Sequence, residues 1–345
     1  MKRIEEIDIL RGVAMLMVVV GHTDCPQLIH GLVSYVHIPL FFMLSGCTNR
    51  PDEYYFIGTN IKKFVWKRVI GLYIPFLMFA MLITALHNAF YTIGVYETNY
   101  TITDYLHQIL RTLLFSVGTN EPMLRQLWFM KSLFLCEIIY AIFVYISHKA
   151  NINKWVLMGP IISIALVIKG SGVPQVLNSN LLWPLAAIVF YVIGGWISRY
   201  ITLCKYRVAI IVPFLVIWFL AAYYCPHHFQ MASGLYAILQ MGLGIGAFLS
   251  FWIVAQYVKR IGLLNSCLTY VGRNTIPIYF QHVLCFYLIS ILTAIMFFPD
   301  SYQLIKTNTH GFIPELNWGV YAIGSTILCL TIYYLYRKIK SVLNF

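Results

Sequence analysis

The first apolar segment of the chain reads ILRGVAMLMVVVGH over residues 9–22. It carries one cation, Arg11, and one imidazole, His22, and no other charged group. An α-helix turns by about 100° per residue, so eleven steps return to within roughly 20° of the starting face, about 16 Å further along the axis. A helix over this segment therefore presents a guanidinium and an imidazole on one stripe, near its two ends.

Polar side chains on this stripe have both a structural and a functional interpretation. A charged or titratable group in an apolar span is costly, so it points first to function. Arg11 could instead be an anchor that snorkels to the headgroups. His22 could instead be held by a hydrogen bond to a neighbouring helix. The functional interpretation suits a reaction that takes its donor from one side of a membrane and serves an acceptor on the other.

The composition is that of a membrane protein. Hydrophobic residues make up 60% of the 345 residues and charged residues 10%, whereas a soluble domain has about 25% charged residues. The net charge of +12 does not indicate nucleic-acid binding, because Lys and Arg fall in short runs between apolar segments, as in the loops of membrane proteins. The partner implied by composition is the lipid bilayer, and nucleic acid is excluded.

Ten apolar segments divide the chain, most of them near the 20 or so residues that a helical span needs. Lipid cannot satisfy free backbone groups, so the spans are predicted to be helices. The predicted fold is therefore all-α: a polytopic membrane protein with a bundle of about ten transmembrane helices, forming one integral-membrane domain over residues 1–345. The segments are residues 8–25, 31–47, 69–93, 127–147, 155–169, 181–198, 207–224, 234–257, 275–298 and 318–336.

The distribution of cations predicts the orientation. With ten spans, 19 of the 24 Lys and Arg residues fall on one side of the membrane. The positive-inside rule makes that side cytoplasmic, with both termini on it. The N-terminus is not predicted to be a signal peptide, because acidic residues interrupt it and no small-residue cleavage site follows. The eight cysteines are scattered without a C-x-x-C pair, and we interpret them as small apolar residues in helices.

Two loops stand out. The cytoplasmic stretch 48–68 ends in KKFVWKR over residues 62–68, which is either a belt facing anionic lipid or a landing site for a polyanionic substrate. The outer stretch 94–126 has apolar residues at helical spacing over residues 105–114. We expect this part to be a helix lying in the membrane interface.

The second segment reads HIPLFFMLSG over residues 37–46 and runs from the outside to the inside. His37 is therefore expected at a depth similar to that of His22, and Ser45 and Gly46 near the depth of Arg11. Small residues such as these also allow close helix packing, which is the structural alternative.

Three further polar residues fall inside predicted spans: Glu137, His282 and Lys131, of which Lys131 lies one turn inside the outer end of its span and could snorkel. Glu137 lies near the middle of the fourth, where a carboxylate must be paired or protonated. It is either a structural partner or the group that orients a catalytic histidine or substrate. His282, in the ninth span, either joins two helices by a hydrogen bond or takes part in the site.

These motifs together resemble the signature of the membrane-bound acyltransferase family 3, which includes the O-acetyltransferases of bacterial surface polysaccharides. The signature is Arg11-x10-His22 followed by Phe41-Phe42-x-x-Ser45-Gly46. The resemblance follows the whole ten-span layout, is densest over residues 5–50, and is nearest to short members similar to fucose 4-O-acetylases. Further agreement comes from Glu6-x-Asp8-x-x-Arg11-Gly12, Trp128-Phe129 and Tyr279-x-x-His282.

The resemblance implies an enzyme of the bacterial inner membrane that transfers an acetyl group from acetyl-CoA to a sugar hydroxyl. It implies that Arg11 and His22 are needed, with His22 as general base and Arg11 holding or polarising the donor; Glu137 is the third catalytic candidate. No metal and no tightly bound cofactor is expected, since acetyl-CoA is a co-substrate. The substrate-binding candidates are His37, Phe41, Phe42, Ser45, Gly46, Trp128, Tyr279 and His282, and the donor-nucleotide candidates are Lys62, Lys63, Lys67 and Arg68.

Two other functions fit part of the pattern. Ten spans with buried His, Glu and Arg also allow a secondary transporter of a sugar or lipid-linked glycan. The sequence shows no inverted repeat and no symmetric Gly/Pro breaks of the kind found in such transporters. A non-catalytic scaffold of a glycan assembly complex would leave the stripe of Arg11 and His22 unexplained.

Overall fold

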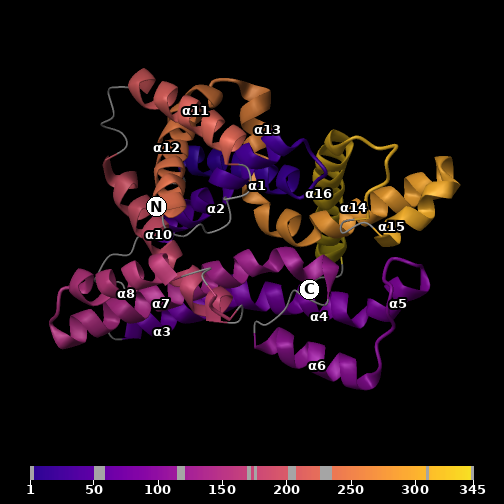
Figure 1. Ribbon diagram of the computed structural model, residues 1–345, viewed down its shortest axis with the longest axis horizontal. Coiled ribbons are helices and arrows are strands. Elements are labelled where there is room, and N and C mark those ends of the chain that lie inside the picture. Colours follow the sequence, from indigo (N-terminus) through magenta and orange to yellow (C-terminus); the bar gives the residue numbers. More distant parts are fainter. Residues whose placement is uncertain are drawn as a thin grey trace.

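The computed structural model describes residues 4–49, 59–114, 121–168, 172–174, 177–200, 207–225, 235–307 and 311–342. Over these residues every regular element is a helix and none is a strand (Figure 1). The prediction of an all-α fold is confirmed.

Each of the ten predicted segments forms helix. Seven stretches of the described residues are long and apolar enough to cross a membrane. Of the remaining three segments, one forms the 17-residue helix Glu5–Gly21, and the other two contain the shorter apolar helical stretches Lys154–Ile168 and Ala209–Tyr224. The ten helices are α1 (Glu5–Gly21), α2 (Gln27–Asn49), α4 (Ile74–Ala85), α7 (Trp128–Ala150), α8 (Lys154–Ile168), α10 (Trp183–Tyr200), α11 (Arg207–Tyr224), α12 (Leu235–Val258), α14 (Thr275–Phe297) and α16 (Trp318–Val342).

Shorter helices join or extend them. A basic helix and a π-helical turn lead into α4, and an amphipathic helix lies between α12 and α14 in the sequence. These elements are α3 (Thr59–Arg68), η2 (Val69–Tyr73), α5 (His87–Thr92), α6 (Ile102–Leu113), η3 (Pro122–Leu127), η4 (Asn178–Leu182), α13 (Gly262–Arg273), η6 (Pro299–Gln303) and α15 (Leu304–Thr307).

The helix expected in the outer stretch is α6. Its polar residues Gln108 and Thr112 are buried, while its apolar residues Leu106 and Leu110 are exposed. It packs along α4 (Figure 1), and the Tyr73 hydroxyl donates to the C=O of Leu113 over 3.1 Å. Tyr73 lies midway along the apolar stretch Ile61–Ala85. α6 thus runs alongside α4 with Leu106 and Leu110 outward, and its place in the membrane interface stays a prediction.

Close backbone contacts hold α2 at the centre of the bundle, where it packs on α10, α1, α12 and α11. A Cβ atom added to Gly46 would lie 1.8 Å from the carbonyl oxygen of Tyr191 on α10. On the same crossing, a Cβ added to Gly194 would lie 2.2 Å from the carbonyl oxygen of Met43. The helices meet this closely only because both positions lack a side chain, which is the packing that small residues allow.

The substitution Gly46→Ala tests this crossing. Its methyl group has to displace backbone, so we expect a loss of about 1–3 kcal/mol in the free energy of unfolding. The matched control is Gly242→Ala on α12, where a Cβ meets nothing within 4 Å. This control is expected to be neutral or to stabilise by up to about 1 kcal/mol. Thermal unfolding of the purified variants in detergent measures both, and equal stability of Gly46→Ala and Gly242→Ala would contradict the packing described here.

Candidate active site

A cavity of about 930 Å³ lies among α1, α2, α4, α7, α14 and α16. Its lining brings together polar groups from parts of the chain that are far apart in sequence. A cavity with an apolar lining and a few convergent polar groups is the usual form of a small-molecule site. The charged and hydroxyl-bearing residues of the lining include Arg11, Ser45, Thr48, Arg68, Glu137 and Arg273.

A buried ion pair forms the polar wall of the cavity. The Nε of Arg68 lies 2.7 Å from Oε2 of Glu137, and the Glu137 side chain is almost fully buried. The hydroxyl of Ser45 donates to the other carboxylate oxygen, Oε1. A carboxylate in the middle of a span needs a partner. Glu137 has two, one cation and one hydroxyl. Three helices are joined at this point: α2, α3 and α7.

A π-helical turn explains how Arg68 comes to lie there. Pro75 has no N–H group, so it cannot make the α-helical hydrogen bond to the carbonyl of Gly71. Instead the N–H of Ile74 bonds to the carbonyl of Val69, one residue further back, which widens the turn. Such π turns occur often at functional sites. Arg68 is the residue directly before this turn.

Two more guanidinium groups line the same cavity. Nη2 of Arg11 donates to the Thr48 hydroxyl over 3.2 Å, so α1 and α2 approach each other here. Nε of Arg273 lies 3.2 Å from Oδ2 of the buried Asp8. In the sequence, Arg273 is one of the 19 cations on the predicted cytoplasmic side, and no motif marks it as a site residue. The signal that could have found it is the sequence Gly272-Arg273-Asn274, which breaks the chain between two apolar stretches.

His22 lies at the end of α1, outside the set of residues that line the cavity. Its Nδ1 is 2.8 Å from the carbonyl oxygen of Val18. Because a carbonyl only accepts, Nδ1 carries the hydrogen in the neutral ring and Nε2 keeps its lone pair. The ring of His22 meets that of His282 edge-on at 5.0 Å. His22 therefore has a basic nitrogen, and one further ring separates it from the cavity wall.

Tyr279 of α14 forms part of that wall, and the buried His282 lies behind it. Tyr279 lines the cavity, and its ring lies 6.3 Å from that of His282. The Tyr279 hydroxyl donates to the carbonyl of Gln126 and accepts from the N–H of Met130 over 3.3 Å. These bonds fix α14 to the start of α7. Nδ1 of His282 lies 2.8 Å from the carbonyl of Tyr279, so it carries the hydrogen there as well.

Aromatic rings complete the lining. Phe129 meets Phe41 at 5.6 Å, Phe42 at 5.4 Å and Tyr279 at 5.9 Å between ring centroids. Phe41, Phe129 and Tyr279 line the cavity, and Phe42 is buried behind them.

The remaining predicted site residues lie outside the cavity. Trp128 packs on Trp183 at 5.0 Å between ring centroids, and Gly46 faces α10. Nδ1 of the buried His37 lies 2.6 Å from the carbonyl of Val33. Lys62, Lys63 and Lys67 are exposed on α3, the helix that ends at Arg68.

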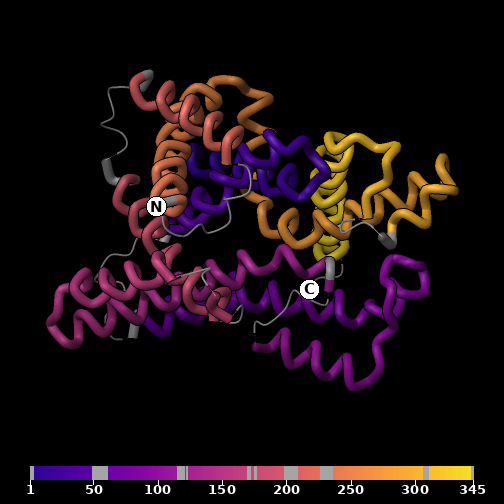
Figure 2. The backbone as a smooth tube through the Cα atoms, viewed as in Figure 1, coloured from indigo at the N-terminus to yellow at the C-terminus, as the bar shows by residue number. Residues whose placement is uncertain are grey.

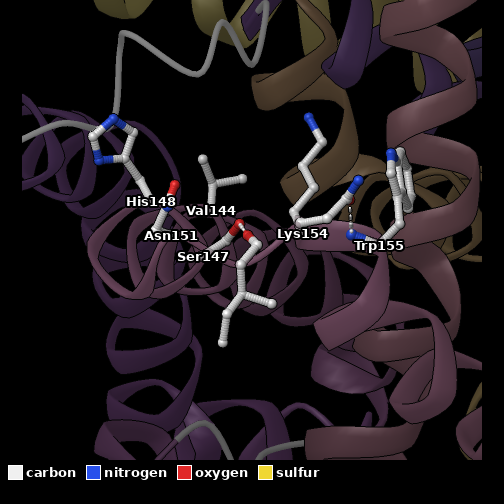
Figure 3. A pocket seen from close by; sticks show the side chains of 8 residues that line it. Val144, Ser147, His148, Asn151, Lys154 and Trp155 are labelled. Atoms are coloured by element: carbon white, nitrogen blue, oxygen red, sulfur yellow. Dashed lines mark hydrogen bonds between the residues drawn. The ribbon is translucent and has the colours of Figure 1, made fainter.

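A second cavity, of about 410 Å³, lies at the turn between α7 and α8 (Figure 3). Ser147, His148 and Lys154 are among its lining residues, and the turn is made by Asn151 in the left-handed conformation at φ 53°. It contains none of the predicted site residues, so we do not assign the transfer chemistry to it.

A buried titratable pair ties down the segment before α7. Nε2 of His87 lies 3.0 Å from the carbonyl of Thr98, and Nδ1 lies 2.8 Å from Oε1 of Glu121. Both side chains are almost fully buried, and the ring of Tyr100 stacks on that of His87 at 3.4 Å. Burial raises the pKa of the Glu121 carboxyl, although the neighbouring His87 opposes that effect.

The sequence also matches a known family. The model described as an acyltransferase domain, family 3, matches residues 4–337. The chain belongs to this acyltransferase family. The prediction of membrane-bound acyltransferase family 3 is confirmed, and the membership favours a transferase over a transporter. No curated protein and no solved structure matches the chain.

In this acyltransferase, Glu137→Gln tests the buried ion pair. The substitution leaves the Arg68 guanidinium buried without its counter-charge, so we expect a loss of about 3–5 kcal/mol of stability. The matched control is Glu5→Gln, which removes an exposed carboxylate 3.9 Å from Lys259 and is expected to cost less than about 1 kcal/mol. Thermal unfolding in detergent compares them. Wild-type stability of Glu137→Gln would show that the pair does not hold these helices.

The pair His87–Glu121 predicts a pH dependence of stability. A carboxyl with a raised pKa binds its proton more tightly in the folded protein than in the unfolded chain. Its contribution is therefore present at low pH and is lost as the pH rises through the raised pKa. Glu121→Gln, which resembles the protonated acid, should flatten this dependence, and Glu97→Gln on an exposed residue should not. Unfolding temperatures across the acidic to neutral range measure the effect, and parallel curves for all three proteins would refute it.

Proposed function

We propose that this acyltransferase is an O-acyltransferase, and specifically an O-acetyltransferase. It takes its acyl group from cytoplasmic acetyl-CoA and transfers it to a hydroxyl of a surface or lipid-linked sugar. We place it in the bacterial inner membrane with both termini in the cytoplasm, as the cation distribution indicates. Acetyl-CoA acts as a co-substrate, with no metal and no tightly bound cofactor.

The observation that carries the proposal is the cavity itself. Arg11, Arg68 and Arg273 line it, and its far wall of Tyr279 and His282 separates it from His22. A donor with an anionic nucleotide and a thin thioester arm fits cations at one end and a base at the other. The exposed Lys62, Lys63 and Lys67 on α3 lead toward Arg68 and would hold the nucleotide.

The residues then divide the reaction between them. We place transfer where the cavity meets the Tyr279–His282 wall. In this proposal the acceptor hydroxyl reaches His22 past the ring of His282. The hydroxyl then attacks the thioester carbonyl, its proton passes to Nε2 of His22, and the carbon–sulfur bond breaks with the proton returned to the leaving thiolate. Arg11 polarises the carbonyl or holds the donor. Glu137 keeps Arg68 and Ser45 in place along the arm.

The other predicted residues support this arrangement from two positions. Phe41 and Tyr279 contact substrate as part of the cavity lining, and Phe42 and Trp128 hold Phe129 against it from behind. His37 and Gly46 lie on α2 outside the cavity, where they position the helix that carries Ser45.

Replacement of His22 tests the proposal. Purified protein in vesicles is given radiolabelled acetyl-CoA and candidate sugars, and transfer of label to the sugar is measured. Loss of a general base is expected to lower the rate by about 10²–10⁴-fold, while the protein stays folded and inserted. The matched control is His107→Ala, an exposed histidine on α6, which should retain wild-type transfer. Normal turnover in His22→Ala, or movement of sugar without label transfer in the wild type, would overturn the proposal.

A further inference from the structure

The cavity has two chemically different sides. Its polar side is the ion pair and the guanidinium groups described above. Its other side is a stripe on η2 and α4 formed by Leu72, Pro75, Phe79 and Leu82, with Met78 beside it. The spacing of three or four residues keeps these side chains on one helical face for about 15 Å. One apolar face of α4 thus runs along the whole polar site.

Several residues that line the cavity also have large exposed fractions. On α4, Met78 is 69% exposed and Leu82 54%. On the opposite rim, Ile276 of α14 is 41% exposed and Tyr336 of α16 is 57% exposed. A side chain can line a cavity and face outward only where the wall is open. The cavity is therefore open between α4 and the pair α14–α16.

The packing of α4 agrees with this opening. Its main contacts are with η2, α6, η3 and α5, and in this view α6 lies on the side of α4 away from α14 and α16 (Figure 2). Across the opening, the ring of Phe79 meets that of Phe280 on α14 at 5.3 Å. This contact closes the far end of the opening and leaves the part near Met78 and Ile276 accessible. α4 belongs to Ile61–Ala85, a stretch long and apolar enough to cross a membrane, so an opening along it is suited to face lipid.

We propose that the acceptor of this enzyme is lipid-carried: a hydroxylated headgroup on a hydrocarbon anchor that enters sideways from the bilayer between α4 and α14–α16. This inference rests on the proposed function and specifies its substrate class. The anchor lies along the stripe from Leu72 to Leu82, and the headgroup reaches Tyr279, where transfer is placed. Hydrogen-bonding groups at the rim, Thr275, Gln281 and Tyr333, suit a sugar.

The position of the opening favours the acceptor over a long acyl chain on the donor. The donor's anionic part belongs with the guanidinium groups and the α3 lysines. The apolar stripe starts at Leu72, four residues after Arg68, and continues away from these cations along α4. A substrate that enters along the stripe can keep its hydrocarbon in the bilayer while its headgroup lies against Tyr279, away from the donor's anionic part. A side opening of this length gives such a substrate access without moving it through water.

Photo-crosslinking tests the opening without requiring turnover. The probe is dodecyl glucoside with a diazirine in its alkyl chain, added to vesicles that contain the purified protein. We expect adducts on Met130 and Leu133, which line the cavity from α7 and are buried. In Met78→Trp the bulky ring narrows the opening, so adducts should fall roughly tenfold, equivalent to about 1.4 kcal/mol of binding. Ile74→Trp, on an exposed residue of α4 outside the cavity lining, should leave them unchanged.

Two results would overturn the inference. Adducts confined to outward-facing residues of α14 such as Leu292 and Ile295 would mean that hydrocarbon does not enter the cavity. Labelling of Met130 by a diazirine-bearing long-chain acyl-CoA, where the glucoside gives none, would assign the opening to the donor. Label transfer from acetyl-CoA is measured in the same vesicles. A protein that gives cavity adducts without transfer refutes the proposed function, whereas transfer without cavity adducts refutes the lipid-carried acceptor.

Discussion

The ion pair between Arg68 and Glu137 is the interaction on which the arrangement of the site depends. A carboxylate buried inside a span is tolerated only with a counter-charge and further hydrogen bonds. Glu137 obtains the counter-charge from Arg68 and a hydrogen bond from Ser45. The three residues lie on three different helices, α7, α3 and α2. The same contact therefore neutralises the charge and sets the width of the cavity between α2 and α7. The same three side chains therefore determine both the stability of this part of the protein and the geometry of the site.

Backbone irregularities make room for this contact, and close packing elsewhere compensates for it. The π turn at Val69–Tyr73 follows from Pro75 and lies directly after Arg68. On the opposite face of α2, Gly46 and Gly194 bring the backbones of α2 and α10 together. One face of α2 is thus packed without side chains between the backbones, and the other is open to a cavity. Rigid contact on one side is what allows a cavity of about 930 Å³ to persist on the other.

The sequence predicted those features that depend on one helix alone. Lipid requires helical spans, so the ten apolar segments could be identified from composition. The prediction of a partner for Glu137 followed from the cost of a buried charge. The partner's identity did not, because Arg68 lies in a basic run that is equally typical of a lipid-facing belt. Arg273 was missed for a related reason: its role comes from the packing of α13 on α1, where Gly272 meets the backbone of Asp8.

The burial of polar residues on α6 shows the same limit of prediction from sequence. An amphipathic period of 3.6 residues is identical for a helix that lies on a membrane and one that enters it. The spacing of Leu106 and Leu110 specified a helix with one apolar face, and only the neighbouring α4 decides which face is buried. Here the polar face, with Gln108 and Thr112, turns inward. The neighbouring helices, rather than the period of 3.6 residues, thus determine which face of such a helix is buried.

The separation of His22 from the cavity follows a chemical logic. A thioester held beside an active base and open water would be hydrolysed, and exclusion of water from a site prevents such side reactions. Tyr279 and His282 lie between the cavity and His22, and Tyr279 is fixed to the start of α7 by two hydrogen bonds. In the proposed reaction, the donor carbonyl meets the base only at this wall. In that reaction an acceptor in the adjoining space would complete the site and exclude water from the thioester.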